Sequence, residues 1–534
     1  MTDMTDKDGI KGTINEDGRP SRRSFLKGSA AVAGAAVAGS IPASSASGEA
    51  VSKPNRAPAF VGGSNQKRPN LVFFYTEGQR PDCLSFTGNK LLKTPNMDRI
   101  AREGVFFDNS FCMNALCAPA RAATMTGLYS HTTGAYGNAT DRALPADVPV
   151  FTDLLHEAGY EVGMVGKAHS PNGLRERYWD YYCAFNGGAT DYYAPHYHEG
   201  RKGEMGPEKV YRGKHHDDFP DNPAMDWTGV YADDWFTDKA LEWLKEKRDK
   251  PFCLLLWHQA PHAPFYRPRR YLNEYNGVPI LIPDTFDADK DGYAGKPRAF
   301  ADAQNKIGTM ESWDRARTLE ELVKDCYAGF RAVDDNIGRV LAYLESTNQL
   351  DDTVVMQSSD HGYFFGEWRS YDKRFMHEPS LRIPAMIRYP KLFQAGTRVK
   401  EMVINLDFAP TLLELAGAEV PENLHGRSLV KLAQGKETRW RKDFLYEYFD
   451  YPGFEQVRPH RGVRTERFKY FHYFLDPQEY EMYDLQKDPG ELNNLAGKPE
   501  YASLQRQLAA RVEELRRETG DHTRNAIISP LKGV

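Results

Sequence analysis

Apolar runs alternate with helical patterns between residues 69 and 361. The run Asn70–Thr76 is apolar and ends at Glu77-Gly78, which is typical of a buried central strand. Similar runs predict strands at 161–165, 252–257 and 353–357. Amphipathic segments, or segments with Pro at the start and Gly at the end, predict helices at 94–104, 150–158, 233–247 and 319–346. This alternation predicts an α/β fold with a large mixed, mostly parallel sheet flanked by helices.

The pattern changes beyond about Leu432. Short strand-like runs follow at 444–449, 462–463 and 469–474, and a charged helical segment at 502–517 closes the chain. We expect a smaller C-terminal α+β domain that carries a short antiparallel sheet and packs on the main domain. The predicted boundaries are 67–431 for the main domain and 432–534 for the C-terminal subdomain.

The N-terminus has the pattern of an export signal. Arg22-Arg23 precedes a weakly apolar stretch at 29–41, and small residues at 42–46 follow as a cleavage site. The stretch is shorter than the roughly 20 apolar residues of a membrane helix. A solvated basic tail is the alternative interpretation. We expect a twin-arginine signal peptide at 1–46 and a linker at 47–66, export by the twin-arginine (Tat) translocon to the periplasm or the medium, and no stable membrane span.

Composition narrows the class of protein. Of 534 residues, 40% are hydrophobic and 27% charged, which excludes disorder, collagen and coiled coil as descriptions of the whole chain. The formal net charge of −5 argues against a general nucleic-acid-binding protein. Six cysteines are too few for a disulfide scaffold. A globular protein with a large core remains.

The segment from Cys117 to Gly127 carries the most informative chemistry. Pro119 and the alanines after it predict a helix that ends at Gly127. Cys117 would lie just before the helix N-terminus, where the helix dipole stabilises an anion, and Arg121 could reach back toward the same end. A lone cysteine is usually a small buried hydrophobic residue, but the Cys-x-Pro-x-Arg pattern favours a reactive side chain.

At these residues the chain resembles the type I, formylglycine-dependent sulfatases of the alkaline-phosphatase superfamily. The resemblance covers about residues 69–496. It rests on Cys117-Ala118-Pro119-Ala120-Arg121 with Thr126-Gly127, and on shorter motifs in family order at 94–96, 166–169, 260–264, 359–362, 372–375, 483–485 and 488–489. Each short motif is weak, but the ordered set is specific.

The resemblance implies a modified nucleophile. In the family the cysteine, here Cys117, is oxidised to formylglycine (3-oxoalanine) by a maturation enzyme that acts on the unfolded chain in the cytoplasm. The aldehyde hydrates, and one hydroxyl, bound to a divalent metal, attacks sulfur. The second hydroxyl then loses its proton and expels sulfate, a step that serine could not perform.

The resemblance also implies a metal site. Glu77, Asp360 and His361 follow predicted strands, where α/β sheets place ligands, and with modified Cys117 they are the expected metal ligands. Hard oxygen ligands favour Ca²⁺, with Mg²⁺ or Mn²⁺ as alternatives. The family usually has Asp at position 77 and often an acid or amide next to it, whereas this chain has Glu77-Gly78. Gln79 or a water could fill the gap.

The remaining catalytic roles are carried over from the family. Arg121 and Lys167 are expected to hold the formylglycine hydroxyls and the sulfate. His169 would orient or deprotonate the hydroxyl that drives elimination. His262 and Lys373 would grip the sulfate ester, and one of them would protonate the leaving alcohol. Without the resemblance, His262 would be a loop histidine and Lys373 an exposed lysine.

These features predict an exported sulfatase, a sulfuric ester hydrolase, that acts on a sulfated carbohydrate. Two alternatives stay open. A phosphate or phosphonate ester hydrolase of the same superfamily would need a stronger cation cluster, because the charge on the phosphorus group is higher than that on a sulfate ester. A non-catalytic binding protein on this fold, suggested by Glu77-Gly78, would keep an unmodified Cys117 and bind no metal.

Overall fold

The computed structural model describes residues 67–138, 144–145, 147–169, 174–211, 230–287, 295–307, 318–453 and 455–523. The predicted signal peptide and linker, residues 1–66, lie outside this part of the chain. All described residues belong to one compact unit. The boundary at 431/432 between main domain and C-terminal subdomain stays a prediction.

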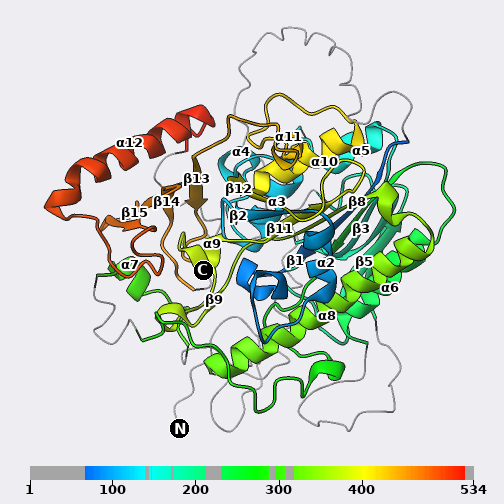
Figure 1. Cartoon of the computed structure of the whole chain (residues 1–534), viewed down its shortest axis with the longest axis horizontal. Coiled ribbons are helices and arrows are strands. Elements are labelled where there is room, and N and C mark those ends of the chain that lie inside the picture. Colours follow the sequence, from blue (N-terminus) through cyan, green and yellow to red (C-terminus); the bar gives the residue numbers. More distant parts are fainter. Residues whose placement is uncertain are drawn as a thin grey trace, which may run out of the picture. The chain divides into compact units, whose positions relative to one another are not determined.

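The central element is a mixed ten-stranded sheet (Figure 1). Its spatial order is β12 (Thr397–Ile404), β2 (Val105–Phe111), β11 (Ala385–Arg388), β8 (Thr353–Ser359), β1 (Asn70–Thr76), β7 (Phe252–Trp257), β3 (Glu161–Lys167), β4 (Tyr181–Phe185), β5 (His196–Arg201) and β6 (Glu204–Val210). The middle strands β8, β1, β7, β3 and β4 are parallel. β11 and the β4–β5–β6 end of the sheet are antiparallel to their neighbours. The predicted sheet is therefore confirmed.

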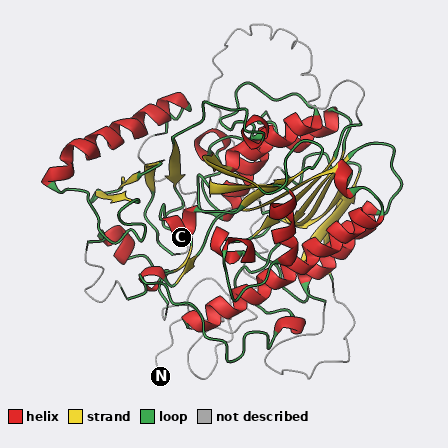
Figure 2. Cartoon of the chain, viewed as in Figure 1, coloured by secondary structure: helices red, strands yellow, loops and turns green. Residues whose placement is uncertain are grey.

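Strand β1 shows how the two faces of the sheet are covered. Leu71, Phe73 and Tyr75 belong to one core, with residues of α3 (Cys117–Thr126), α5 (Phe151–Glu157) and α10 (Phe408–Ala416). Val72 and Phe74 belong to a second core, with residues of α2 (Pro95–Glu103), α6 (Ala232–Leu244) and α8 (Leu319–Ser346). Alternate side chains of a strand point to opposite faces, so helices cover both sides (Figure 2).

The helices predicted in the main domain are present as α2, α3, α5, α6 and α8. The bounds of α8 agree with the prediction because its start has a strong local signal. Thr318 accepts a hydrogen bond from the Glu321 amide, and the Glu321 side chain accepts one from the Thr318 amide. This capping box satisfies amide groups that the first turn leaves unpaired.

The C-terminal region forms a second, four-stranded antiparallel sheet in the order β13 (Asp443–Tyr448), β14 (His460–Thr465), β15 (Phe468–Tyr473) and β16 (Glu479–Asp484). Helix α12 (Ala502–Glu518) packs on it and buries Leu508, Val512 and Leu515. The small antiparallel sheet is as predicted, but the sequence did not indicate β16. Acids alternate with aromatic and apolar residues there, so no apolar run marks the strand.

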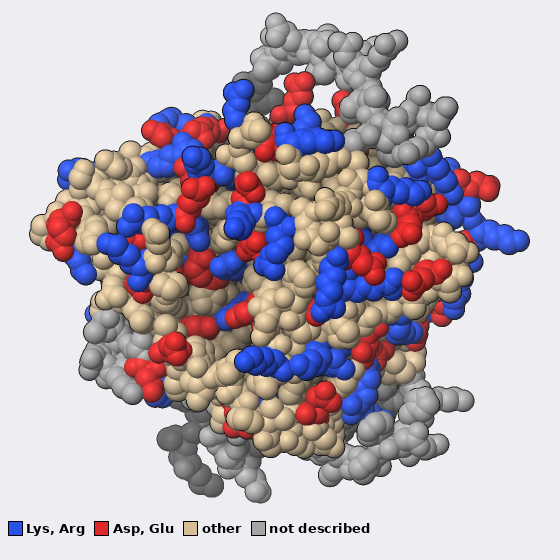
Figure 3. Space-filling view, viewed as in Figure 1, with Lys and Arg blue, Asp and Glu red and all other residues tan. Residues whose placement is uncertain are grey.

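The visible surface carries both signs of charge. Basic and acidic side chains are interspersed over the face shown in Figure 3 rather than gathered into one basic field. Among the helices in the described ranges, none has the length and apolar character needed to cross a membrane.

Candidate active site

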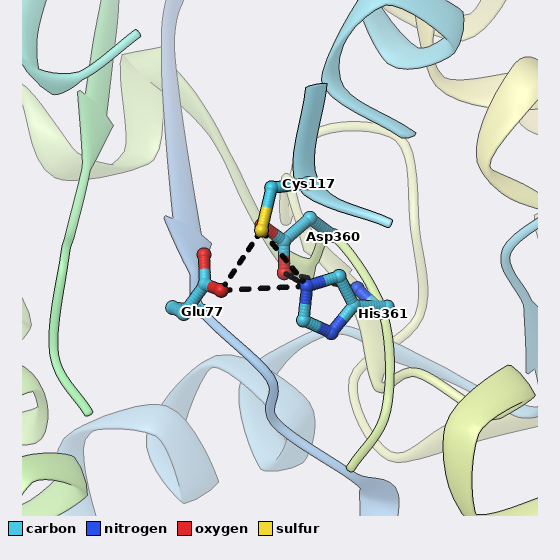
Figure 4. A group of neighbouring side chains, drawn as sticks. All are labelled: Glu77, Cys117, Asp360 and His361. Carbon is cyan, nitrogen blue, oxygen red and sulfur yellow. Dashed lines mark hydrogen bonds and ion pairs between the residues drawn. The ribbon is translucent and has the colours of Figure 1, made fainter. Parts of the chain in front are cut away.

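The sheet topology brings the ends of several strands together. Glu77 follows β1, Lys167 ends β3, and Asp360 and His361 follow β8. These three strands run in the same direction within one sheet, so their carboxyl ends share an edge. Cys117, the first residue of helix α3, lies at this edge (Figure 4).

Helix α3 begins at Cys117, two residues before Pro119. The expectation that Cys117 lies just before the helix was therefore off by one residue, because Leu116 is the N-cap and Pro119 lies within the first turn. The helix ends at Gly127, whose φ of 71° suits a left-handed C-cap. Cys117 is fully buried.

The backbone before Cys117 is held by the C-terminal sheet. The Ala115 amide donates to the Tyr446 hydroxyl at 3.1 Å, and the Glu447 amide donates to the Met113 carbonyl at 3.1 Å. Both Tyr446 and Glu447 lie on β13. The segment that leads into α3 is thus fixed by residues more than 300 positions later.

Four buried side chains form a group that could hold a metal. One ligand atom from each of Glu77, Cys117, Asp360 and His361 lies within 4.8 Å of the others. The Cys117 Sγ is 3.2 Å from Glu77 Oε1 and 3.4 Å from His361 Nε2 (Figure 4). His361 Nδ1 donates to the Gly362 carbonyl at 2.8 Å, which leaves Nε2 as the ligand atom. Two carboxylates and an imidazole fit a divalent cation.

Gln79 does not complete this group. Its carbonyl oxygen accepts hydrogen bonds from Thr76 Oγ1 at 2.8 Å and from Gln357 Nε2 at 2.9 Å, and its amide nitrogen donates to the Cys83 carbonyl at 3.3 Å. Gly78 has φ +60°, and a Cβ there would meet the Tyr363 ring at 3.2 Å. The idea that Gln79 fills the gap is therefore wrong, because its amide is used within the fold.

Three cations surround the carboxylates. Lys167 Nζ lies 2.7 Å from Glu77 Oε2, and Lys373 Nζ lies 3.1 Å from Glu77 Oε1. The Arg121 guanidinium pairs with Asp360 at 2.8 Å and with Glu77 at 3.2 Å. Arg121 also donates to the Lys167 carbonyl at 2.6 Å and is fully buried, so its position is rigidly fixed.

Two histidines line the same group. His262 Nδ1 donates to the Ala263 carbonyl at 2.8 Å, and its Nε2 lies 3.8 Å from Glu77 Oε1. Its side chain is 17% exposed, so it lies between the buried group and solvent. His169 is buried at a φ of 27° and interacts with the Cys117 side chain.

The electrostatic environment favours an anion at position 117. Burial and the Glu77 carboxylate favour the neutral thiol, but Lys167, Lys373 and His361 outweigh them and lower the pKa of Cys117 well below its usual value. Burial lowers the pKa of His169 to about 4. Burial, together with Lys167, also lowers the pKa of His262. Both histidines are therefore neutral at neutral pH.

The structure brings every predicted site residue to this one group, but it also adds residues that the sequence did not single out. Asp372 lies 3.4 Å from Lys373 Nζ and pairs with Arg374, which in turn pairs with Glu455 at 2.6 Å. Asp372 and Arg374 flank Lys373 in a quoted motif, so their proximity was foreseeable. Glu455 comes from a loop of the C-terminal region, and nothing in its sequence surroundings indicated the contact.

Comparison with known families agrees with this geometry. Residues 69–418 match the model of the family described as "Sulfatase". Residues 366–518 match "N-sulphoglucosamine sulphohydrolase, C-terminal". Residues 19–39 match the twin-arginine translocation signal, so the protein is exported by that route to the periplasm or the medium.

Individual relatives cover most of the chain. An N-acetylglucosamine-6-O-sulfatase from Bacteroides thetaiotaomicron is 34% identical over 85% of this chain and 88% of its own. An ulvan-active sulfatase from Formosa agariphila is 27% identical over 85% and 82%. A solved structure in complex with its substrate, D-glucosamine-2-N,6-O-disulfate, superposes with a TM-score of 0.76 at 33% identity and covers 86% of this chain and 99% of that one.

These matches favour sulfate ester hydrolysis over the phosphate or phosphonate alternative and over a non-catalytic role. The family in general uses a metal and a formylglycine. The buried group contains side chains that could bind a metal and the cysteine of the family motif. The chain belongs to the sulfatase family and is an exported enzyme that hydrolyses sulfate esters.

Proposed function

We propose that this enzyme removes sulfate esters from carbohydrates, and in particular the 6-O-sulfate of glucosamine units. The support is the name of the 34% identical relative, an N-acetylglucosamine-6-O-sulfatase, and the glucosamine 2-N,6-O-disulfate bound in the solved structure with a TM-score of 0.76. The observation in this chain that carries the proposal is the ring of Lys167, Lys373 and His262 around Cys117 and Glu77, which suits a sulfate group.

We propose Cys117 as the site of formylglycine, made by a maturation enzyme before folding, and Ca²⁺ as the metal. Glu77, Asp360, His361 and the modified residue 117 would hold the ion, which suits its preference for oxygen ligands. When bound, the ion and the hydrated aldehyde supply a nucleophilic hydroxyl of lowered pKa. Mg²⁺ and Mn²⁺ are the alternative metals that elemental analysis would detect.

The chain's own residues would then do three things. Lys167 and Lys373 have six N–H donors between them; each donates one to Glu77, which leaves four for sulfate oxygens. The positive charge of Arg121 compensates the negative charges of Glu77 and Asp360, so that both buried carboxylates can stay ionised beside an anionic substrate. His169, neutral and next to residue 117, can accept a proton there.

We assign protonation of the leaving alcohol to His262. Its Nδ1–H is fixed on the Ala263 carbonyl, so Nε2 is the atom that faces the substrate. Burial lowers the pKa of His262 and keeps the ring neutral in the free enzyme; an anionic sulfate beside Nε2 would favour its protonated form, which is then a strong acid. The pKa of Lys373 is instead raised well above its usual value: burial opposes this, but Asp372 and the anions around Cys117 prevail. Lys373 is therefore the poorer proton donor.

We also propose residues 432–534 as a C-terminal subdomain, supported by its separate four-stranded sheet. Within it, β13 contacts the backbone that leads to Cys117. The subdomain would thus contribute to the site although the proposed ligands all come from the main domain.

The test is desulfation of defined saccharides by protein co-produced with a formylglycine-generating enzyme. Mass spectrometry of the peptide Met113–Arg121 gives the fraction of Cys117 converted, and elemental analysis gives the metal. We expect release of sulfate from 6-O-sulfated N-acetyl- or N-sulfoglucosamine and none from a Cys117→Ala control. Activity confined to sugars sulfated at other positions would overturn the substrate assignment. An unmodified Cys117 in an active enzyme would overturn the nucleophile.

A further inference from the structure

Helix α3 has no capping side chain of its own. Its N-cap is Leu116, which offers no side-chain acceptor, and the Ala120 amide already bonds to the Leu116 carbonyl at 2.9 Å. Pro119 has no amide hydrogen. An uncapped first turn leaves amide groups unpaired and tends to fray. In this helix the first turn carries residue 117.

A distant asparagine supplies the missing acceptor. Asn138 Oδ1 accepts a hydrogen bond from the Ala118 amide at 3.1 Å, in a part-buried position. Asn138 follows the short helix α4 (Ser130–Thr133) and lies 20 residues beyond Ala118. The capped amide belongs to the residue directly after Cys117. The bond therefore acts on the backbone at the nucleophile.

Asn138 is itself held by the C-terminal region. Its backbone amide lies close enough to the Asp450 carboxylate to lower the pKa of that group, against the larger effect of burial. Gly137 packs so closely on Asp450 that a Cβ at position 137 would overlap the carboxylate, so a larger residue there would displace the Asp450 side chain. Asp450 is 9% exposed, and Arg374 is the cation beside it. Contacts therefore link Asp450 to the segment Gly137-Asn138, and a hydrogen bond links Asn138 to Ala118.

These contacts have a counterpart on the other side of Cys117. There Tyr446 and the Glu447 amide hold residues 115 and 113. Both sides of residue 117 are thus fixed from β13 or from the loop that follows it. A group that must be aligned within a few tenths of an ångström of its partners is sensitive to such support, because a displacement of about 1 Å can cost about 10²-fold in rate.

We propose that Asn138 is a positioning residue for the nucleophile at position 117, and that Asp450 keeps Asn138 in place. The inference rests on the proposed role of Cys117. Asn138 does not touch the reacting atoms in this assignment. It fixes the first turn of α3, so that residue 117 faces Lys167 and His361 in one orientation.

The experiment compares Asn138→Ala, Asn138→Asp and Asp450→Asn with the unchanged enzyme on an aryl sulfate. All are co-produced with the maturation enzyme, and rates are normalised to the converted fraction of Cys117. We expect Asn138→Ala to lower kcat about tenfold with KM changed less than about twofold. Asn138→Asp keeps the acceptor and should recover most of kcat, while its added charge raises KM for the anionic substrate.

A matched control separates positioning from general stability. Asn494 is also part-buried, and its Oδ1 accepts from the Met482 and Ala496 amides at 3.0 Å, far along the chain in the C-terminal sheet. Asn494→Ala should lower the unfolding temperature as much as Asn138→Ala but leave kcat unchanged. A double variant, Asn138→Ala with Asp450→Asn, should be no slower than the slower single variant, because both changes act on the same series of contacts.

Two results would overturn the inference. One is an Asn138→Ala enzyme with kcat within about twofold of the unchanged enzyme. The other is an equal loss of kcat in Asn494→Ala, which would show a general effect of lower stability. Failure of the proposed function is distinguishable, since the unchanged enzyme would then lack formylglycine or sulfatase activity.

Discussion

The ε-amino group of Lys167 lies 2.7 Å from Oε2 of Glu77 at the centre of the site. Glu77 is 2% exposed, and its carboxylate also contacts Cys117 Sγ and Lys373 Nζ through Oε1. Burial would raise the pKa of Glu77, but Lys167, Lys373 and His262 together hold it well below the usual value. The carboxylate is therefore ionised at neutral pH, as a metal ligand must be.

Loss of this charge should weaken metal binding. We expect Glu77→Gln to reduce Ca²⁺ affinity by at least about tenfold, because one of two carboxylates in the group becomes neutral. Calorimetric titration of the metal-free protein measures this without any turnover. Glu367→Gln is the control, since Glu367 pairs with Arg80 outside the group. Unchanged affinity in Glu77→Gln would remove Glu77 from the ligand set.

His262 should matter most for poor leaving groups. We expect His262→Ala to slow hydrolysis of a sugar sulfate by about 10²–10⁴-fold and to slow an activated aryl sulfate much less, because only the sugar alcohol needs a proton as it leaves. Paired kcat/KM measurements on the two substrates test this. Equal losses of kcat/KM on both substrates would show that another group protonates the leaving alcohol, and Lys373 would then be the next candidate.

Arg121 should be essential for folding as well as for the site. It is fully buried between Asp360 and Glu77. Replacement by Met removes the guanidinium partner of buried Asp360 and one of the three cations around Glu77, and should cost about 3–5 kcal/mol of unfolding free energy, by denaturant titration. The exposed pair Arg201–Glu246 provides the comparison, and Arg201→Met should cost less than about 1 kcal/mol. Similar costs for the two variants would contradict the prediction.

His131 should make stability fall at alkaline pH. Its Nδ1 faces the Glu447 carboxylate at 2.8 Å and its Nε2 faces the Thr519 carbonyl at 3.0 Å, and both partners only accept hydrogen bonds. Burial opposes charging of the ring, but Glu447 prevails and raises the pKa of His131 above 6.5. The stabilisation is fully present below pH 6.5 and is lost as the pH rises through the higher folded pKa.

The measurement is the unfolding temperature between about pH 6 and pH 9. The difference between the unchanged protein and His131→Gln should be largest at the acid end and shrink as the pH rises. His196→Gln is the control, because the His196 side chain is 54% exposed. A difference that grows with pH would contradict the assignment.

The parts of the fold that the sequence predicted correctly are those with strong local signals. Strand β1 is buried throughout, so its apolar run has the same bounds as the strand. Strands β5 and β6 were missed because they lie at the end of the sheet and are largely polar, with β5 half-buried and β6 mostly exposed. For the site, parallel strand topology was enough to place Glu77, Asp360 and His361 at one edge, whereas Lys167 was expected there only from the family resemblance.

Contacts between segments far apart in sequence could not be predicted. The side-chain amide of Gln79 contacts Gln357, and Asn138 accepts a hydrogen bond from the Ala118 amide, 20 residues earlier in the chain. Neither residue has a neighbour pattern that indicates its partner, because the partner is set by how loops cross after the sheet has formed. The same holds for Glu455 beside Arg374.

The bond between Ala115 and Tyr446 bears on the order of events during synthesis. The strand that fixes the approach to Cys117 leaves the ribosome hundreds of residues after Cys117 itself, on the order of tens of seconds later. Until then the reactive segment has no final support and stays open to the proposed maturation enzyme. Late synthesis of the C-terminal sheet would thus limit the time available for the proposed oxidation, before the folded protein passes through the export channel.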